Sequence, residues 1–132
     1  MACHLIEEAK NGSLDPQRIK DALDELERLV ESDKFDVSIC RCKTCQQAYI
    51  YCFREFNSRQ FQDYYWNFWV PVTDEDISGF KKIEIECGPV AEIIRTRPHI
   101  ARDDKNKVLW YPSGNPVAHT LFTIPYVVDY PL

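Results

Sequence analysis

The sequence lacks most of the features that would assign it to a common functional class. Its 132 residues contain only four glycines, with no glycine-rich phosphate loop, no nucleophile-elbow serine motif and no zinc-protease helix motif. No window approaches the ~18 apolar residues that a membrane-spanning helix needs. The first eight residues also lack the basic and apolar segments of a signal peptide. We therefore expect a cytoplasmic protein that does not contact a membrane.

The chain also has fewer basic than acidic residues. The chain has 16 Lys and Arg against 21 Asp and Glu, which gives a formal net charge of -5. Affinity for nucleic acid comes from clustered cations that neutralise phosphates. This balance argues against nucleic acid as the main ligand and favours a protein or small-molecule partner, and a protein partner would be a basic one.

What the chain does contain is the pattern of a single α+β domain over residues 1–132. Asp15 followed by Pro16 is typical of a helix start, and apolar residues at helical spacing predict an amphipathic helix over residues 16–32. Residues 35–40 and 48–53 alternate between apolar and polar side chains, which predicts a β-hairpin. We expect an antiparallel sheet that includes this hairpin, with the amphipathic helix packed on one face.

The second half of the chain continues the same α+β pattern. Aromatic and β-branched residues predict a third strand over residues 61–70, ended by Pro71. Thr73 and the acidic residues after it predict the start of a short helix. The remaining expected elements are a short helix ending near residue 97, a hairpin over residues 100–111 and a strand over residues 117–124.

The most chemically specific feature is a group of three cysteines, Cys40, Cys42 and Cys45, in the turn of the first hairpin. In a reducing compartment, cysteines are more often free, metal-bound or redox-active than paired in disulfides. With Lys43 and Thr44 as the turn, cross-strand pairing places the three thiols on one face. The same pairing places Cys52 on the other face, where we expect it to belong to the core.

The turn from Cys42 to Cys45, preceded by Cys40, resembles the zinc knuckle of zinc-ribbon proteins over this hairpin. In that family a second Cys-x-x-Cys follows further along the chain, and this sequence has none. The resemblance implies a structural Zn²⁺ ion bound by Cys40, Cys42 and Cys45 with one distant fourth ligand. We prefer Cys87 as the fourth ligand, because thiolates commonly group together. The other candidates are His99, His119, Cys3 and His4.

The cysteines have two further interpretations that the sequence leaves open. They can be packing residues of a hairpin that binds no metal. Alternatively, the protein is a thiol-dependent enzyme or redox protein that uses Cys42 and Cys45, or Cys87 with a histidine. A thioredoxin-like site needs its Cys-x-x-Cys at a helix N-terminus, whereas strands are expected on both sides of this one. The sequence therefore assigns no catalytic residue.

Aromatic residues are abundant, with three Trp, seven Tyr and seven Phe. Tyr64, Trp66 and Trp69 are candidate binding residues, because Trp and Tyr often anchor protein interfaces. The alternative is a central strand whose rings lie partly in the core and partly beneath a helix. We therefore predict a non-enzymatic intracellular adaptor or inhibitor, similar in its properties to immunity proteins, that presents an acidic, aromatic surface to a protein partner. A further alternative is an aromatic platform that stacks on nucleic-acid bases.

Overall fold

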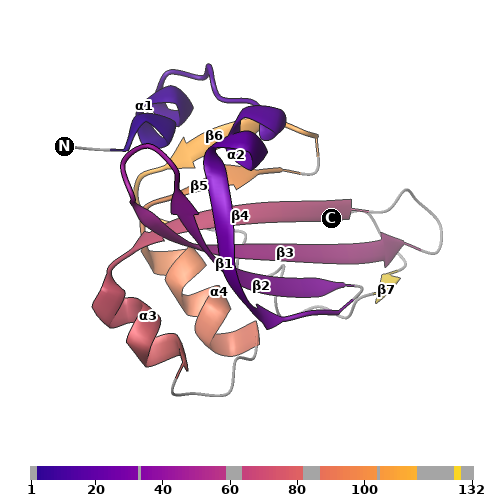
Figure 1. Ribbon diagram of the computed structural model, residues 1–132. Coiled ribbons are helices and arrows are strands. Elements are labelled where there is room, and N and C mark those ends of the chain that lie inside the picture. Colours follow the sequence, from indigo (N-terminus) through magenta and orange to yellow (C-terminus); the bar gives the residue numbers. More distant parts are fainter. Residues whose placement is uncertain are drawn as a thin grey trace.

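An antiparallel β-sheet forms the centre of the protein (Figure 1). The computed structural model describes residues 3–32, 34–58, 64–81, 87–103, 105–115 and 127–128. Six strands follow one another in the order β1-β2-β3-β4-β5-β6, each antiparallel to the next, and a short β7 pairs in parallel with β3. The predicted α+β class is confirmed. The strands are β1 Leu23–Val30, β2 Phe35–Cys42, β3 Ala48–Ser58, β4 Tyr64–Val72, β5 His99–Arg102, β6 Val108–Tyr111 and β7 Val127–Val128, and the helices are α1 His4–Lys10, α2 Pro16–Ala22, α3 Asp74–Lys81 and α4 Cys87–Thr96.

Helices pack on both faces of the sheet, and each face has its own apolar cluster. On one face, α3 and α4 contribute Phe80, Val90 and Ile94 to a cluster with strand residues such as Ile50. On the other face, α1 and α2 contribute residues such as Leu5 to a second cluster. Because side chains alternate along a strand, each central strand supplies both clusters. The face covered by α1 and α2 is the one that bears the functional groups described below.

The first hairpin forms as expected, but its register differs by two residues from the simplest two-residue turn. Cys40 pairs with Tyr49, and Val37 pairs with Cys52. The N–H of Cys42 donates to the carbonyl of Gln47 (2.9 Å), so the two strands close at this pair and the turn between them is longer than two residues. A shift of two residues keeps every side chain on its predicted face, whereas a shift of one would reverse them all. The prediction that Cys52 lies in the core is confirmed, since it is 1% exposed in the first cluster.

The predicted helix over residues 16–32 is wrong in its second half. Asp15 caps α2 through a 2.9 Å hydrogen bond from the N–H of Arg18, as expected, but α2 ends at Ala22 and β1 follows directly. The Leu, Glu and Arg residues of β1 have good helix propensity. Pairing with β2 along one edge of the sheet outweighs that local preference, and two register shifts let β1 follow its neighbour.

The third predicted strand is also confirmed as a strand, but Pro71 does not end it. β4 continues through Pro71 to Val72, and Pro71 lies opposite Tyr49 of β3. On its other side β4 pairs with β5 only from Asn67 to Trp69. Because Pro71 lies beyond that pairing, its missing N–H breaks no hydrogen bond to β5. Residues 61–63 lie outside the described residues.

The remaining elements agree with the sequence patterns where the structure describes them. Thr73 caps α3, since its hydroxyl oxygen accepts from the N–H of Asp76 (3.2 Å), and α4 ends at Thr96. β5 and β6 form the expected second hairpin. The predicted strand over residues 117–124 lies outside the described residues.

Candidate metal centre

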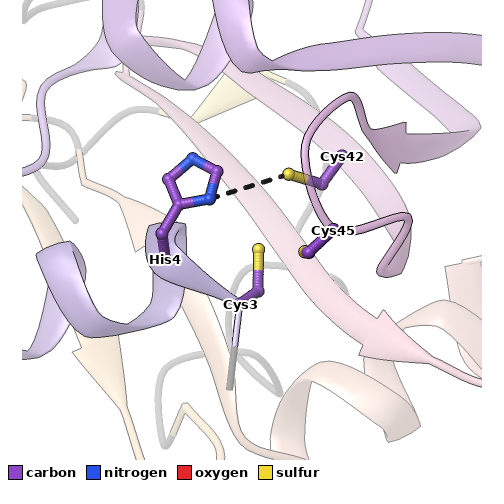
Figure 2. A group of neighbouring side chains, drawn as sticks. All are labelled: Cys3, His4, Cys42 and Cys45. Carbon is purple, nitrogen blue, oxygen red and sulfur yellow. Dashed lines mark hydrogen bonds between the residues drawn. The ribbon is translucent and has the colours of Figure 1, made fainter. Parts of the chain in front are cut away.

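Four side chains from two distant segments converge beside the first hairpin. Cys3, His4, Cys42 and Cys45 each offer one ligand atom, and these four atoms all lie within 4.8 Å of one another. Figure 2 shows Cys3 and His4 at the start of α1 facing the two cysteines of the hairpin turn. The Sγ of Cys42 lies 4.0 Å from the Nδ1 of His4. The donor set of three thiols and one imidazole is typical of structural zinc sites.

The first pair of ligands is held in place by the packing of α1. Cys3 is the N-cap residue of α1, and its carbonyl accepts from the N–H of Ile6 (3.0 Å). The buried side of α1, which includes Leu5 and Ile6, packs into the second apolar cluster. Cys3 is extended and His4 is helical, so the change of backbone conformation between them lets two adjacent side chains face one centre.

The second pair of ligands is held by the hairpin turn. Cys42 is the last residue of β2 and is fully buried, whereas Cys45 is exposed in the turn. The carbonyl of Cys42 accepts from the N–H of Gln46 (3.0 Å), and Gln46 adopts a φ of 67°. That left-handed residue closes the turn and returns the chain to β3. The N–H of Lys43 also donates to the carbonyl of Ala22 (2.9 Å), which ties the turn to the end of α2.

The spacing of the four atoms fits a tetrahedral ion after a small contraction. Zinc bound at about 2.3 Å to sulfur and about 2.0 Å to nitrogen places neighbouring ligand atoms about 3.7 Å apart. The widest separation of 4.8 Å therefore has to close by about 1 Å. Cys45 is exposed and His4 is partly buried, so their side chains have more room to rotate than those of the buried Cys3 and Cys42.

The thiols differ in their readiness to lose a proton. Burial raises the pKa of the Cys3 thiol to about 12. Burial acts in the same direction on Cys45, but hydrogen bonding to the backbone of Gln47 and to the two neighbouring thiols outweighs it, so the pKa of Cys45 lies below its usual value. A bound cation would favour the thiolate at every position.

A buried phenol beside the thiols supports the same interpretation. Tyr49 is fully buried, and among the described residues its hydroxyl has no hydrogen-bond partner of good geometry. It nevertheless lies close enough to Cys3 to offset part of the rise in the pKa of that thiol that burial causes. A buried hydroxyl without a partner is costly, and a metal-bound Cys3 thiolate would give it a strong acceptor. The arrangement of this phenol beside the thiols is therefore compatible with a bound cation.

The structure brings together only part of the ligand set expected from the sequence. Cys42 and Cys45 belong to the cluster, and Cys3 and His4 were among the candidates for the fourth ligand. Cys40 lies on the same face of β2 but outside the cluster, where it lines a separate cavity. The preferred fourth ligand, Cys87, begins α4, and its side chain is not among those described.

The other two candidate histidines, His99 and His119, lie away from this cluster or outside the described residues. His99 is buried, and its Nδ1 lies 2.9 Å from the carbonyl oxygen of Arg97. His119 lies outside the described residues. The signal in the sequence for this part of the cluster is the adjacent pair of Cys3 and His4, which stands at the start of a short segment with apolar residues. No spacing rule links that pair to a hairpin almost forty residues later.

The aromatic candidates do not form one surface. Trp66 is partly buried against the first apolar cluster and stacks with Phe68 (5.7 Å between ring centroids). Trp69 is buried in the second cluster on the opposite face. Tyr64 begins β4, and its side chain is not among those described. Alternation along β4 therefore divides the two tryptophans between the two faces of the sheet.

Comparison of the chain with protein-family models, with curated proteins and with solved structures finds no significant match. No helix in the described part of the chain is both long enough and apolar enough to span a bilayer. The geometry of the Cys/His cluster is consequently the observation on which a functional interpretation can rest. The chain contains a group of side chains within metal-binding distance that resembles a zinc knuckle.

Proposed function

We propose that Cys3, His4, Cys42 and Cys45 bind one structural Zn²⁺ ion in a non-enzymatic protein. The observation that carries the proposal is the convergence of four ligand atoms within 4.8 Å of one another. Four protein ligands complete a tetrahedral shell, whereas catalytic zinc keeps one position open for water or substrate. Thiolate and imidazole ligands also favour zinc over calcium or magnesium, which prefer oxygen.

The metal would join two parts of the chain that are distant in sequence. His4 and Cys42 are 38 positions apart, and α1 has only seven residues. A helix of that length is not stable alone and depends on tertiary contacts. The ion would add a strong link between α1 and the first hairpin to the apolar packing of Leu5 and Ile6.

The test is the zinc content of freshly purified, tag-free protein, measured by elemental mass spectrometry. We expect one zinc per chain in the wild type and less than a tenth of that in Cys3→Ser and Cys45→Ser. Cys40→Ala is the matched control, because Cys40 lies outside the cluster, and it should retain the full zinc content. A metal-free wild type that neither takes up added zinc nor gains stability from it would contradict the proposal.

We further propose that the protein binds a basic protein partner through the outer edge of β1. β1 is an edge strand, and among the described residues it has a strand partner only on one side. Asp24 and Glu27 are exposed there, as is Leu26, whose exposed fraction is 53%. An exposed edge can accept a strand from a partner, and carboxylates steer a basic one. This edge replaces the aromatic surface expected from the sequence.

The partner proposal is tested by capture from the native cell followed by affinity measurement with the identified, purified protein. Leu26→Lys should weaken binding at least about tenfold, because it removes the apolar anchor and adds a repulsive charge. Glu75→Lys serves as the control. It adds a cation on α3, which packs on the first apolar cluster and is not part of the β1 edge. Equal binding by both variants would exclude the β1 edge as the interface.

Thiol chemistry is a second candidate function, favoured by the exposure of Cys45 and its lowered pKa. In that case Cys45 would react with an electrophile or form a disulfide with a neighbouring thiol. Rapid alkylation of Cys45 below neutral pH in protein that contains zinc would favour this candidate. Protection of Cys45 by zinc, reversed by a chelator, would instead favour the structural site.

A further inference from the structure

A cavity of about 500 Å³ opens on the same face of the sheet as the metal cluster, beside α2. Its volume lies within the range of small-molecule sites. Tyr51 of β3 and Trp69 of β4 line it side by side, paired across the two strands, with ring centroids 5.4 Å apart. Cys40 also lines the cavity, and it is separate from the proposed metal ligands. The cavity therefore offers aromatic surface that is independent of the metal cluster.

Buried polar groups at the cavity lack partners among the described residues. Asn67 lines the cavity and is 7% exposed. Its amide nitrogen donates to the hydroxyl of Tyr51 (2.6 Å), but its Oδ1 has no partner there. Arg102 pairs with Asn67 across β4 and β5, and its Nε is likewise buried without a hydrogen bond. Unsatisfied groups of this kind are often completed by a ligand or by ordered water.

The charges around the cavity leave an excess of cations. Glu25 and Arg28 pair with each other (3.0 Å), and Glu25 also accepts from the hydroxyl of Ser38 (2.7 Å). Lys20 and Arg102 also line the cavity, and neither has a carboxylate partner among the described residues. Arg102 instead lies over the ring of Tyr65 (5.3 Å from the centroid).

The remaining ionisable groups of the cavity do not cancel this positive charge. Burial raises the pKa of Cys40 to about 12, and burial likewise raises the pKa of Tyr51 to about 12. Both groups are therefore neutral at physiological pH. The four charged residues that line the cavity, Lys20, Glu25, Arg28 and Arg102, therefore carry a net positive charge in a protein whose formal net charge is -5.

We propose that this cavity binds a small aromatic organic anion. The ring of the ligand packs on Tyr51 and Trp69, and its acidic group meets the guanidinium of Arg102 and the ammonium of Lys20. Aromatic faces supply affinity and orientation, while charge-assisted hydrogen bonds select an anion over a neutral molecule of the same shape. The binding site requires no metal and stands independently of the proposed zinc centre.

The test uses two fluorescent probes of nearly equal shape, the sulfonate 8-anilinonaphthalene-1-sulfonate and the neutral N-phenyl-1-naphthylamine. At low salt, the wild type should bind the sulfonate saturably at one site and more tightly than the neutral probe. Arg102→Gln should weaken binding of the sulfonate about tenfold and leave binding of the neutral probe unchanged. Lys20→Gln, at an exposed position that tolerates substitution, should weaken it in the same direction.

The control is Arg95→Gln, which removes a cation from α4 on the opposite face of the sheet. This variant should bind both probes as the wild type does, and near-UV circular dichroism should show that each variant is folded. If Arg102→Gln does not fold, Lys20→Gln decides the question alone. Equal affinity for the two probes, unchanged sulfonate binding in Lys20→Gln or Arg102→Gln, or no saturable sulfonate binding would each overturn the proposal.

Discussion

The chemistry of the proposed metal centre depends on which side chains surround its sulfur atoms. Tyr49 is the clearest case, because its buried hydroxyl lies next to Cys3 and has no other partner among the described residues. A phenol that donates to a metal-bound thiolate orients it and stabilises its charge. Tyr49 is therefore a positioning residue in the proposed site.

We expect Tyr49→Phe to lower zinc affinity about tenfold, in the range measured for residues that support metal ligands. The variant keeps the aromatic ring in the core, so the apolar packing is preserved. Competition with a chromophoric chelator measures the affinity directly. Tyr51→Phe is the control, since Tyr51 pairs with Asn67 outside the cluster, and an equal effect of both substitutions would argue against a specific role for Tyr49.

His99 determines a second property at the scale of single residues, the response of stability to pH. Its ring is buried and stacks on Tyr111 (5.4 Å between centroids, 9° between planes). The Nδ1 donates to the carbonyl of Arg97, whereas the Nε2 has no partner among the described residues. Burial lowers the pKa of His99, so the folded protein holds a neutral imidazole.

Because the folded pKa of His99 lies below the unfolded value of about 6.5, the unfolded chain takes up a proton first as the pH falls. The contribution of this residue to stability is complete above about pH 6.5 and is lost below it, by at most about 1.4 kcal/mol per pH unit. The difference in unfolding free energy between wild type and His99→Gln should therefore shrink between pH 7.5 and pH 5.5, as measured by urea denaturation. A constant difference would show that His99 does not titrate in this way.

At the scale of elements, local sequence signals compete with tertiary contacts. In α3 the local signal, a helix cap, agrees with the structure. The hydroxyl of Thr73 accepts from the N–H of Asp76, and the carboxylate of Asp76 accepts from the N–H of Thr73 (3.0 Å). Arg97 pairs with the same carboxylate (3.0 Å), which joins the start of α3 to the end of α4. This reciprocal cap explains why the helix start was predictable.

We expect Thr73→Ala to reduce the free energy of unfolding by about 1 kcal/mol, because the N–H of Asp76 loses its acceptor. Urea denaturation at neutral pH measures the change. Thr73→Ser retains the hydroxyl and should lie close to the wild type. A loss of similar size in Thr73→Ser would point to the methyl group of Thr73 and away from the cap.

β1 shows the opposite balance between local and tertiary signals. Its sequence favours a helix by propensity and by the spacing of its leucines, yet Leu26 is exposed and the segment pairs with β2 as an edge strand. The hydrogen bonds offered by β2 are available only in the assembled sheet. Tertiary context therefore overrides a weak local preference.

At the scale of the whole molecule, the proposed metal links α1 to the hairpin without entering the first apolar cluster. The residues of that cluster come from the sheet and from α3 and α4. Loss of the metal should consequently loosen one end of the second cluster and leave the first largely intact.

Hydrogen exchange of the zinc-loaded and chelator-treated protein tests this expectation. Exchange should rise in α1 and in the turn after Cys42, while the centres of β3 and β4 remain protected. Free zinc at about 1,000 times its Kd should also stabilise the native state by about 4 kcal/mol. A uniform rise in exchange along the whole chain would mean that the metal supports the entire fold.

The sequence by itself determined the faces of the first hairpin, the start of α3 and the second hairpin. These features follow from interactions over a few residues, such as the alternation that separates Cys42 from Cys52. Only the tertiary structure decided that residues 23–30 form an edge strand and that Cys3 and His4 join Cys42 and Cys45, while Cys40 lines a cavity. These features have no periodic signal in the sequence, because the pairing of β1 with β2 and the contact of Cys3 and His4 with the hairpin turn depend on packing that exists only after the sheet and its helices have assembled.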